Sequence, residues 1–455
     1  MKRFRQLDFT QRVGNRELGR FLLPLFLSAG FQCIYAMVNT AVLSRYLSQD
    51  AVALTGVCSG CVSLINTMLP AFVSGFGVRL SRCIGSGDPE EIRQGFWGTV
   101  YLTSAMGALC LSFPLFAESI LQQANVPEAL MPDAIAYFRG ILFGAGFLYL
   151  KLILISTIQG MGNSAVPAML SMAGVVVQTF LVVFLIAGLR MGITAPALAM
   201  LINHLWQILV LAWFLGKLSG GRLSFTSPFS IQSAHYLDTL ANGCSKGLLF
   251  LCLSVGSFFM QRMENTLLAD LLAGDTYSDQ YTSLFTELLS VYGTAAVVIV
   301  GQNAGRGNYG VIHDYVRRLF RRSLPVFALI AVLCLGFAPA LIRGLAGAGA
   351  SQEAVQAGIF QMRIIVVSYP FLTALVILRY ALQSMGDYRA MPLFGFIEMT
   401  INIVMASLIP RLGYLAVCLG LSLSRIGAGL AAVLRYRRFM RHRRQNTSDA
   451  CITNP

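Results

Sequence analysis

Long apolar segments recur from one end of the chain to the other, with short polar turns between them. A helix needs about 20 apolar residues to cross the hydrocarbon core of a bilayer. The pattern therefore predicts an all-α integral membrane protein with twelve transmembrane helices. We place these helices at residues 18–44, 51–79, 92–118, 134–158, 165–188, 192–215, 238–268, 280–303, 315–342, 356–384, 390–410 and 413–435.

Composition and charge agree with a membrane protein. Only 12% of the 455 residues are charged, whereas a soluble globular protein carries about 25%. The formal net charge of +14 would suit a nucleic-acid partner, but most Lys and Arg lie in the even-numbered loops and at the two ends. Cytoplasmic loops carry such an excess of positive charge. We therefore expect no nucleic-acid partner, and a multi-pass protein of the plasma membrane with both termini in the cytoplasm.

Loop motifs repeat along the chain at nearly constant spacing. Four matches occur in the same order in the two halves, which argues for duplication of a six-helix unit. The pairs are Gly-Ser-Gly-Asp at 85–88 with Gly-Arg-Gly-Asn at 305–308, Gln-Gly-Met-Gly-Asn at 159–163 with Gln-Ser-Met-Gly-Asp at 383–387, Arg139 with Arg363, and Asn39-Thr40 with Asn265-Thr266. The glycines suit tight turns, because Gly adopts positive φ without strain.

Six is an even number, so both copies share one orientation in the membrane. We expect two six-helix bundles related by a pseudo-two-fold axis along the membrane normal, with a cavity between them. The predicted parts are an N-terminal lobe at 1–216, a cytoplasmic linker at 217–237, a C-terminal lobe at 238–436 and a basic tail at 437–455. The tail is most simply a determinant of topology, and attraction to the anionic leaflet is the alternative.

Signatures of ATP hydrolysis, metal binding and catalysis are missing from the sequence. There is no GxxxxGK[ST] pattern. Cys58 and Cys61 form a CxxC without the second Cys or His pair that zinc and redox sites need. The four His residues have no partner at motif spacing, and catalysis would need a clustered acid–base set. We expect no metal site, no cofactor and no enzymatic activity.

The loop motifs resemble those of a known family. Gly-Gln-Asn-Ala-Gly-Arg-Gly at 301–307 resembles the Gly-Gln-Asn-x-Gly-Ala-Gly signature of the multidrug and toxic compound extrusion (MATE) transporters. Ile-Gln-Gly-Met-Gly at 158–162 is similar to that family's Leu-Gln-Gly-x-Gly. Tyr-Ala-Met-Val-Asn-Thr at 35–40 is similar to its Tyr-x-x-Val-Asp-Thr, and Pro24 also fits.

The resemblance extends over nearly the whole chain and carries expectations about function. It implies two six-helix bundles around a cavity that opens alternately to each side of the membrane. It also implies export of amphipathic, often cationic compounds in exchange for Na⁺ or H⁺. We expect such a protein to act as a monomer in the lipid bilayer on a small-molecule substrate.

Several positions depart from the family pattern. The first-helix Asp of the family corresponds to Asn39, which cannot titrate, and Val182 holds the place of the fifth-helix Asp. Gln178 stands where the family has Asn. Some relatives use a Glu in the middle of the seventh helix, and here Glu264 lies about three turns later. The resemblance therefore implies that the usual ion site of the N-terminal half is missing.

Ionisable residues inside a membrane segment are costly and normally face a cavity or a partner. Glu287 and Glu398 lie deep in the eighth and eleventh predicted helices. An isolated carboxylate there could carry a coupling proton, whereas one paired with Arg379 or Arg425 could not. Both a cavity-facing role and a structural hydrogen-bonding role remain open for each Glu.

Two further polar groups have two interpretations each, and a third has one. Gln32, Tyr35 and Asn39 fall on one stripe of the first helix, which is either cavity lining or interhelical packing. Arg262 and Glu264 form either an interfacial pair or part of a site. The Asp residues between the seventh and eighth helices are most simply a solvated loop. The complete set of substrate and ion candidates is Gln32, Tyr35, Asn39, Gln178, Glu264, Glu287, Arg379 and Glu398.

Our leading hypothesis is a secondary active transporter that exports small amphipathic or cationic compounds by antiport with H⁺ or Na⁺. The alternative is a flippase-like carrier of a lipid-linked substrate, which a cavity lined by Arg262, Arg379 and Arg425 would favour. A channel is disfavoured by the two-lobed repeat.

Overall fold

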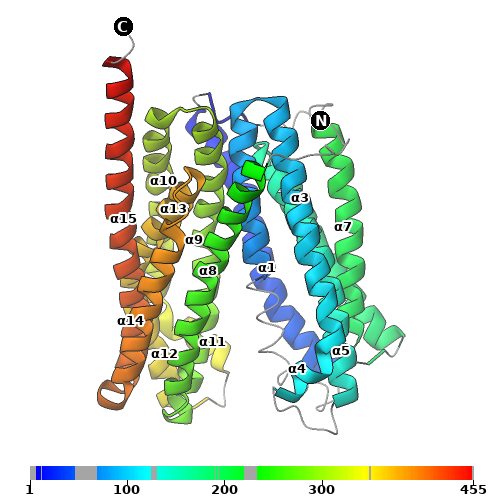
Figure 1. Cartoon of the computed structure of the whole chain (residues 1–455). Helices are drawn as coiled ribbons and strands as arrows, with labels where there is room; N and C mark the ends of the chain where they lie inside the picture. The colour runs from blue at the N-terminus through cyan, green and yellow to red at the C-terminus, as the bar shows by residue number, and fades with distance from the viewer. Residues whose placement is uncertain are drawn as a thin grey trace. The chain divides into compact units, whose positions relative to one another are not determined.

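A computed structural model describes residues 7–11, 13–46, 69–123, 131–189, 191–192, 194–219, 233–347 and 350–452. At 34–46, 444–452 and a few helix ends it describes the backbone alone. Every regular element within these ranges is a helix (Figure 1). The predicted all-α class is therefore confirmed.

The helices follow one another with short connections. The first part of the chain forms α1 (Asn15–Tyr46), a helix described over 69–86, α3 (Pro89–Ser112), α4 (Ala117–Gln123), α5 (Met131–Gly160), α6 (Ala165–Val183) and α7 (Ala195–Ser219). The second part forms α8 (Ser233–Glu264), α9 (Ala269–Gly305), α10 (Tyr309–Gly336), α11 (Ala338–Ala346), α12 (Gln352–Ile365), α13 (Tyr369–Ser384), α14 (Ala390–Leu412) and α15 (Tyr414–Ile452). A 3₁₀ turn joins α3 to α4 and another joins α12 to α13, while a π-helical turn at Phe184–Gly188 extends α6.

Ten helices in the described part of the chain are long and apolar enough to cross a membrane. Residues 51–68 of the second predicted helix lie outside the described residues, so the count of twelve stays a prediction. Several helices exceed the thickness of the hydrocarbon core. α9 has 37 residues, which correspond to about 55 Å at 1.5 Å per residue.

The chain divides into two compact units. The first unit contains the residues up to Gly247 together with Gly301–Asn308, and the second contains Leu248–Val300 and the residues from Tyr309 onward. α8 and α9 each run through both units. The division therefore differs from the predicted lobes at the start of α8 and at the end of α9. The predicted lobe boundaries stay a prediction.

Each unit has its own apolar core. In the first unit the buried side chains of Phe138, Leu142 and Tyr149 on α5 anchor one cluster. In the second unit Tyr369 and Leu372 on α13 pack with residues of α9, α10 and α12. Large apolar side chains also lie on the outside of the helices, which suits contact with lipid. Examples are Leu115, Val176, Phe180, Leu209, Phe258 and Leu329.

The predicted glycine turns are confirmed. Gly87, Gly162, Gly307 and Gly386 have φ values of 79°, 82°, 77° and 92°, a region that residues with a Cβ rarely adopt. After the first of these turns, Asp88 caps α3 by accepting a hydrogen bond from the Glu90 backbone N–H at 3.0 Å. A short polar side chain at this position satisfies a backbone donor that has no partner within the helix.

The predicted acidic loop between the seventh and eighth helices is wrong. α9 begins at Ala269, eleven residues before the predicted start at 280, so Asp270, Asp275 and Asp279 belong to its first three turns. Apolar residues interleave with these carboxylates at helical spacing, and this pattern outweighs the local polarity. Asp275 and Asp279 are four residues apart and therefore share one helix face.

Two other boundaries differ from prediction. The predicted helix at 315–342 is interrupted at Phe337, and Pro339 lies in the first turn of α11, where a missing N–H costs nothing. The predicted basic tail is helical, because α15 continues to Ile452 and extends past α10 and α13 (Figure 1).

Candidate functional site

The deepest ionisable residues of the second unit form a buried polar centre. Arg379 on α13 donates to Glu398 on α14 at 3.4 Å, and both side chains are buried. Arg425 on α15 donates to Thr286 of α9 at 3.0 Å and lies over the ring of Tyr369. Glu398 is therefore an ion-paired residue of the interior. By the criterion applied to the sequence, this pairing argues against a role for Glu398 as the coupling base.

Glu287 has different surroundings from Glu398. It follows Thr286 on α9, but its side chain is exposed. Of the predicted site residues in this part of the second unit, Arg379 and Glu398 are brought together as a pair.

A second polar group lies where α8 ends and α9 begins. Glu264 is the last residue of α8 and only 9% exposed. Asp275 accepts from the Tyr414 hydroxyl at 3.5 Å, and that hydroxyl is 3.1 Å from the Gln361 side-chain oxygen. Asp279 is close enough to repel both Glu264 and Asp275. We call Glu264, Asp275 and Asp279 the acidic group.

The predicted interfacial pair of Arg262 and Glu264 is wrong. Arg262 is exposed and Glu264 is buried. The salt bridges of the described residues do not include this pair. Residues two apart in an α-helix point in nearly opposite directions, so one helix face cannot present both.

The first unit holds an amide network in place of carboxylates. Gln178 on α6 is buried against α7, with its amide oriented to donate to the Ala199 carbonyl at 3.1 Å. On α7, the Asn203 side-chain oxygen accepts from Trp206 and Gln207, each at 2.9 Å. Val182, at the place of the family's fifth-helix Asp, is fully buried in an apolar cluster. Gln178 therefore connects two helices within the first unit.

The polar stripe on the first helix is described only in part. Gln32 is exposed and donates to Ser28 one turn earlier at 3.3 Å. Tyr35 and Asn39 lie in α1, but their side chains fall outside the described residues. The choice between cavity lining and packing stays open for this stripe.

A buried His and a half-buried Lys in the first unit were not predicted to be neighbours. His204 on α7 is 5% exposed, and its Nδ1 lies 3.3 Å from the Gly144 carbonyl oxygen of α5. Lys151 on α5 lies close enough to repel a positive charge on His204. A helical side chain leans toward the N-terminus of its helix, so Lys151 extends toward the depth of Gly144. The proximity of two residues on different helices has no signature in the sequence.

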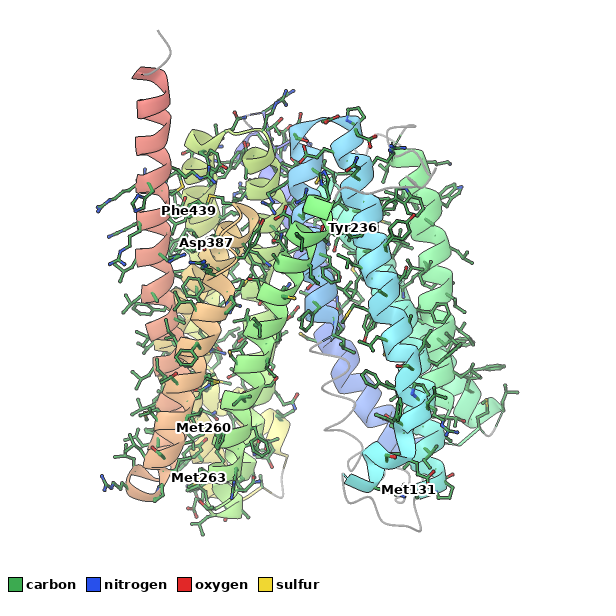
Figure 2. All side chains as sticks on the ribbon, in the orientation of Figure 1. Met131, Tyr236, Met260, Met263, Asp387 and Phe439 are labelled. Atoms are coloured by element: carbon green, nitrogen blue, oxygen red, sulfur yellow. The ribbon has the colours of Figure 1, made fainter. Side chains whose placement is uncertain are left out.

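An ionic cluster joins the helix at 69–86 to the start of α8. Arg79 contacts both Asp238 and His235, and Arg82 donates to both carboxylate oxygens of Asp238 at 3.3 Å. Asp238 lies two residues beyond Tyr236, at the opposite end of α8 from Met260 and Met263 (Figure 2). We call Arg79, Arg82, His235 and Asp238 the ionic clasp.

The two family-like loop motifs of the sequence meet in the first unit. The Gln302 side chain donates to the Gly160 carbonyl at 2.6 Å and accepts from the Phe9 backbone N–H at 2.9 Å. Asn303 donates to the Phe9 carbonyl at 2.9 Å. We call Gln302 and Asn303 the amide clasp. The glycines of these motifs predicted tight turns, but the role of the two amide side chains was not predicted.

The motif at 383–387, which corresponds to the motif at 159–163, makes a different contact. Asp387, in the loop after α13, accepts two hydrogen bonds from Arg435 of α15, at 2.8 and 2.9 Å. Figure 2 labels Asp387 beside the part of α15 that carries Phe439. Such a bidentate pair fixes the geometry of both partners. One basic residue of the C-terminal helix therefore has a structural role.

Comparison with known proteins places the chain in a class. The structure matches a solved structure described as the outward-facing conformation of a multidrug resistance MATE family transporter of the MOP superfamily. The TM-score is 0.86 and the sequence identity is 18%, over 97% of this chain and 98% of that chain. The chain therefore has the same fold as that structure.

The family follows from the sequence. The MatE family model matches twice, at residues 24–185 and 247–408, so the chain belongs to the MATE family of multidrug efflux transporters and is not an enzyme. The probable multidrug resistance protein YpnP of Bacillus subtilis is 23% identical over 438 residues, which are 94% of this chain and 96% of that protein. YoeA of the same organism, also a probable multidrug resistance protein, is 25% identical over 207 residues, 44% of this chain and 45% of that protein. These relatives lend no support to a carrier of lipid-linked substrates.

Proposed function

We propose that this transporter exports small amphipathic or cationic compounds across the plasma membrane by alternating access, in exchange for H⁺. Family membership supports the export of small molecules, and the relatives are named for multidrug resistance. The observation that carries the choice of coupling site is the acidic group of the second unit.

The acidic group is suited to bind a proton for three reasons. Its carboxylates come from two helix ends, so a small helix movement changes their separation. Glu264 is buried, and mutual repulsion with Asp279 is relieved when one of the two is protonated. The Tyr414 hydroxyl has one proton to donate and lies near both Asp275 and Gln361. It can therefore donate to either side chain, according to whether Asp275 is charged.

The first unit offers different chemistry at the positions where the family resemblance places the usual ion site. Val182 is apolar and Gln178 hydrogen-bonds within the unit, while Asn39 cannot titrate. We therefore propose that coupling has moved to the second unit. Glu398 is already paired with Arg379, which leaves Glu264 as the leading candidate among the predicted carboxylates.

Substrate contacts are proposed for the remaining candidates. Glu287 is exposed on α9 and would attract a cationic substrate. The substrate would also contact the polar groups of Gln32, Tyr35 and Asn39. Arg379 would contribute by holding Glu398 in place. The distribution of Lys and Arg supports cytoplasmic termini, and the protein is proposed to act as a monomer.

Dye transport in proteoliposomes tests this function. A fluorescent cationic dye is followed while a pH gradient and a Na⁺ gradient are imposed in turn. We expect transport with the pH gradient, and at least about a tenfold loss in Glu264→Gln, in line with the usual contribution of a positioned proton-transfer group. The exposed Glu353→Gln on α12 serves as the control. Transport driven by Na⁺ alone would overturn H⁺ coupling, and no response to either gradient in folded protein would overturn antiport.

A further inference from the structure

A short segment ahead of α1 is held in the first unit although it is not helical. We call residues 7–10 the N-terminal strap. Phe9 is fully buried, and its ring packs edge-on against Phe21 with 5.1 Å between ring centroids. A buried backbone needs a partner for both its N–H and its C=O. At Phe9 these partners are the side chains of Gln302 and Asn303.

The strap is held at further points by the same two loop motifs. The Leu7 backbone N–H donates to the Gly162 carbonyl at 3.2 Å, and Arg306 donates to the Thr10 hydroxyl at 2.7 Å. A Cβ at Gly162 would overlap the Leu7 carbonyl oxygen. Gly162 therefore serves both the turn and the close approach of the strap.

The two residues of the amide clasp lie near the end of α9, a helix that belongs mainly to the second unit. α9 lies in the second unit up to Val300, and Gly301–Asn308 lie in the first. Within the first unit, the end of α9 packs reciprocally against the end of the helix at 69–86. A Cβ at Gly85 would meet the backbone of Gln302, and a Cβ at Gly305 would meet the backbone of Arg82. Each contact repeats the other at a spacing of 220 residues.

The same spacing relates the two clasps. Arg82 lies 220 residues before Gln302 and holds Asp238 at the start of α8. Gln302 holds Phe9 ahead of α1. The end of the helix at 69–86 therefore holds the start of α8, and the end of α9 holds the segment ahead of α1. In each half of the chain, the second helix contacts the entry to the first helix of the other half. The first half does this with an ion pair. The second half does it with the neutral amides of Gln302 and Asn303, together with a hydrogen bond from Arg306 to the uncharged Thr10 hydroxyl.

We infer that the N-terminal strap is a releasable gate, which Gln302 and Asn303 hold when this end of the transporter is closed and release when it opens. The inference rests on the alternating access proposed above. The end of α9 cannot leave the first unit while its amides hold the strap. Neutral hydrogen bonds suit release, because each exchanges for a water contact at small net cost.

The strap is also shaped to leave as a unit. Asp8 accepts from the Thr10 backbone N–H at 2.9 Å and from its hydroxyl at 2.6 Å. This local turn does not depend on the clasp, so the strap keeps its shape after release. Rebinding then needs the ordering of fewer residues.

Hydrogen–deuterium exchange of the full-length protein in nanodiscs tests the gate. The Leu7 and Phe9 amides are outside any helix, so their protection reports the clasp. We expect exchange at least about tenfold slower than in a free chain. Gln302→Ala and Gly162→Ala should remove that protection, whereas protection in α13 should persist. Gly87→Ala is the matched control, since Gly87 has the same positive φ but open space around it.

The same protein is then measured in proteoliposomes during dye transport. Strap exchange should rise several-fold with substrate and gradient together, and stay slow with either alone. A strap that exchanges as a free chain at rest, or keeps its full protection while transport proceeds, would overturn the gate. An absence of transport in the parent would instead overturn the proposed function and with it gating, while the resting protection would still show whether the clasp forms.

Discussion

The ionic clasp and the amide clasp hold equivalent places in the two repeats with different chemistry. Arg82 and Arg79 contact the side chains of Asp238 and His235, whereas Gln302 and Asn303 contact the backbone of the strap. The ionic clasp needs a particular side chain as its partner. The amide clasp binds backbone groups, so it needs only that the strap backbone comes close. The two matching segments therefore make the same kind of contact with different chemistry.

Removing Asp238 should have the largest effect on stability. In Asp238→Ala, Arg79 keeps its buried position without its carboxylate partner. Breaking a buried ion pair on one side costs about 3 kcal/mol or more. The thermal midpoint in detergent should fall clearly below that of the parent. Glu90→Ala, which removes an exposed pair with Arg93, should lower the thermal midpoint far less, because exposed ion pairs contribute little to stability. Equal effects of the two changes would mean that the ionic clasp adds little.

Removing the Gln302 amide should have an intermediate effect. Gln302→Ala leaves the Phe9 N–H and the Gly160 carbonyl without their partner, and each unsatisfied buried group costs about 1–3 kcal/mol. If the strap detaches, water satisfies both groups and the loss is smaller. The loss of stability should therefore stay below that of Asp238→Ala, as measured by thermal unfolding in the same detergent. A loss larger than that of Asp238→Ala would contradict the view that the amide clasp is the readily released one.

The smallest expected effect is a difference between the two clasps in how the thermal midpoint responds to salt. Charges that are partly exposed are screened, and the Debye length falls to about 3 Å at 1 M salt. Arg82 and Asp238 are 19% and 23% exposed, so raising NaCl should lower the thermal midpoint slightly in Gln302→Ala, which keeps the ionic clasp. Asp238→Asn should show a weaker salt response. The same response in both variants would mean that the ionic clasp is not screened.

The sequence predicted the parts of the molecule that depend on local pattern. The helical class and the turns at Gly87, Gly162, Gly307 and Gly386 follow from apolar length and glycine position, and the family was indicated by the resemblance of the loop motifs. The extension of α9 through Asp275 and Asp279 was missed, because local polarity was given more weight than helical spacing.

The candidate site was predicted less well, because it depends on contacts between distant residues. Pairing of Glu398 with Arg379 was foreseen as an option, but the exposure of Glu287 and the burial of Glu264 are set by tertiary packing. Phe9 and Gln302 are 293 residues apart. One signal for the amide clasp was present, since a glycine turn does not require the adjacent Gln and Asn.

Proton movement driven by substrate is the most direct test of antiport in this transporter. Proteoliposomes that contain a pH-sensitive dye are given a gradient of a cationic substrate, without an imposed pH or Na⁺ gradient. The account predicts that substrate entry changes the internal pH in the parent and that Glu264→Gln abolishes this change. Substrate entry with an unchanged internal pH in the parent would contradict proton coupling through the acidic group.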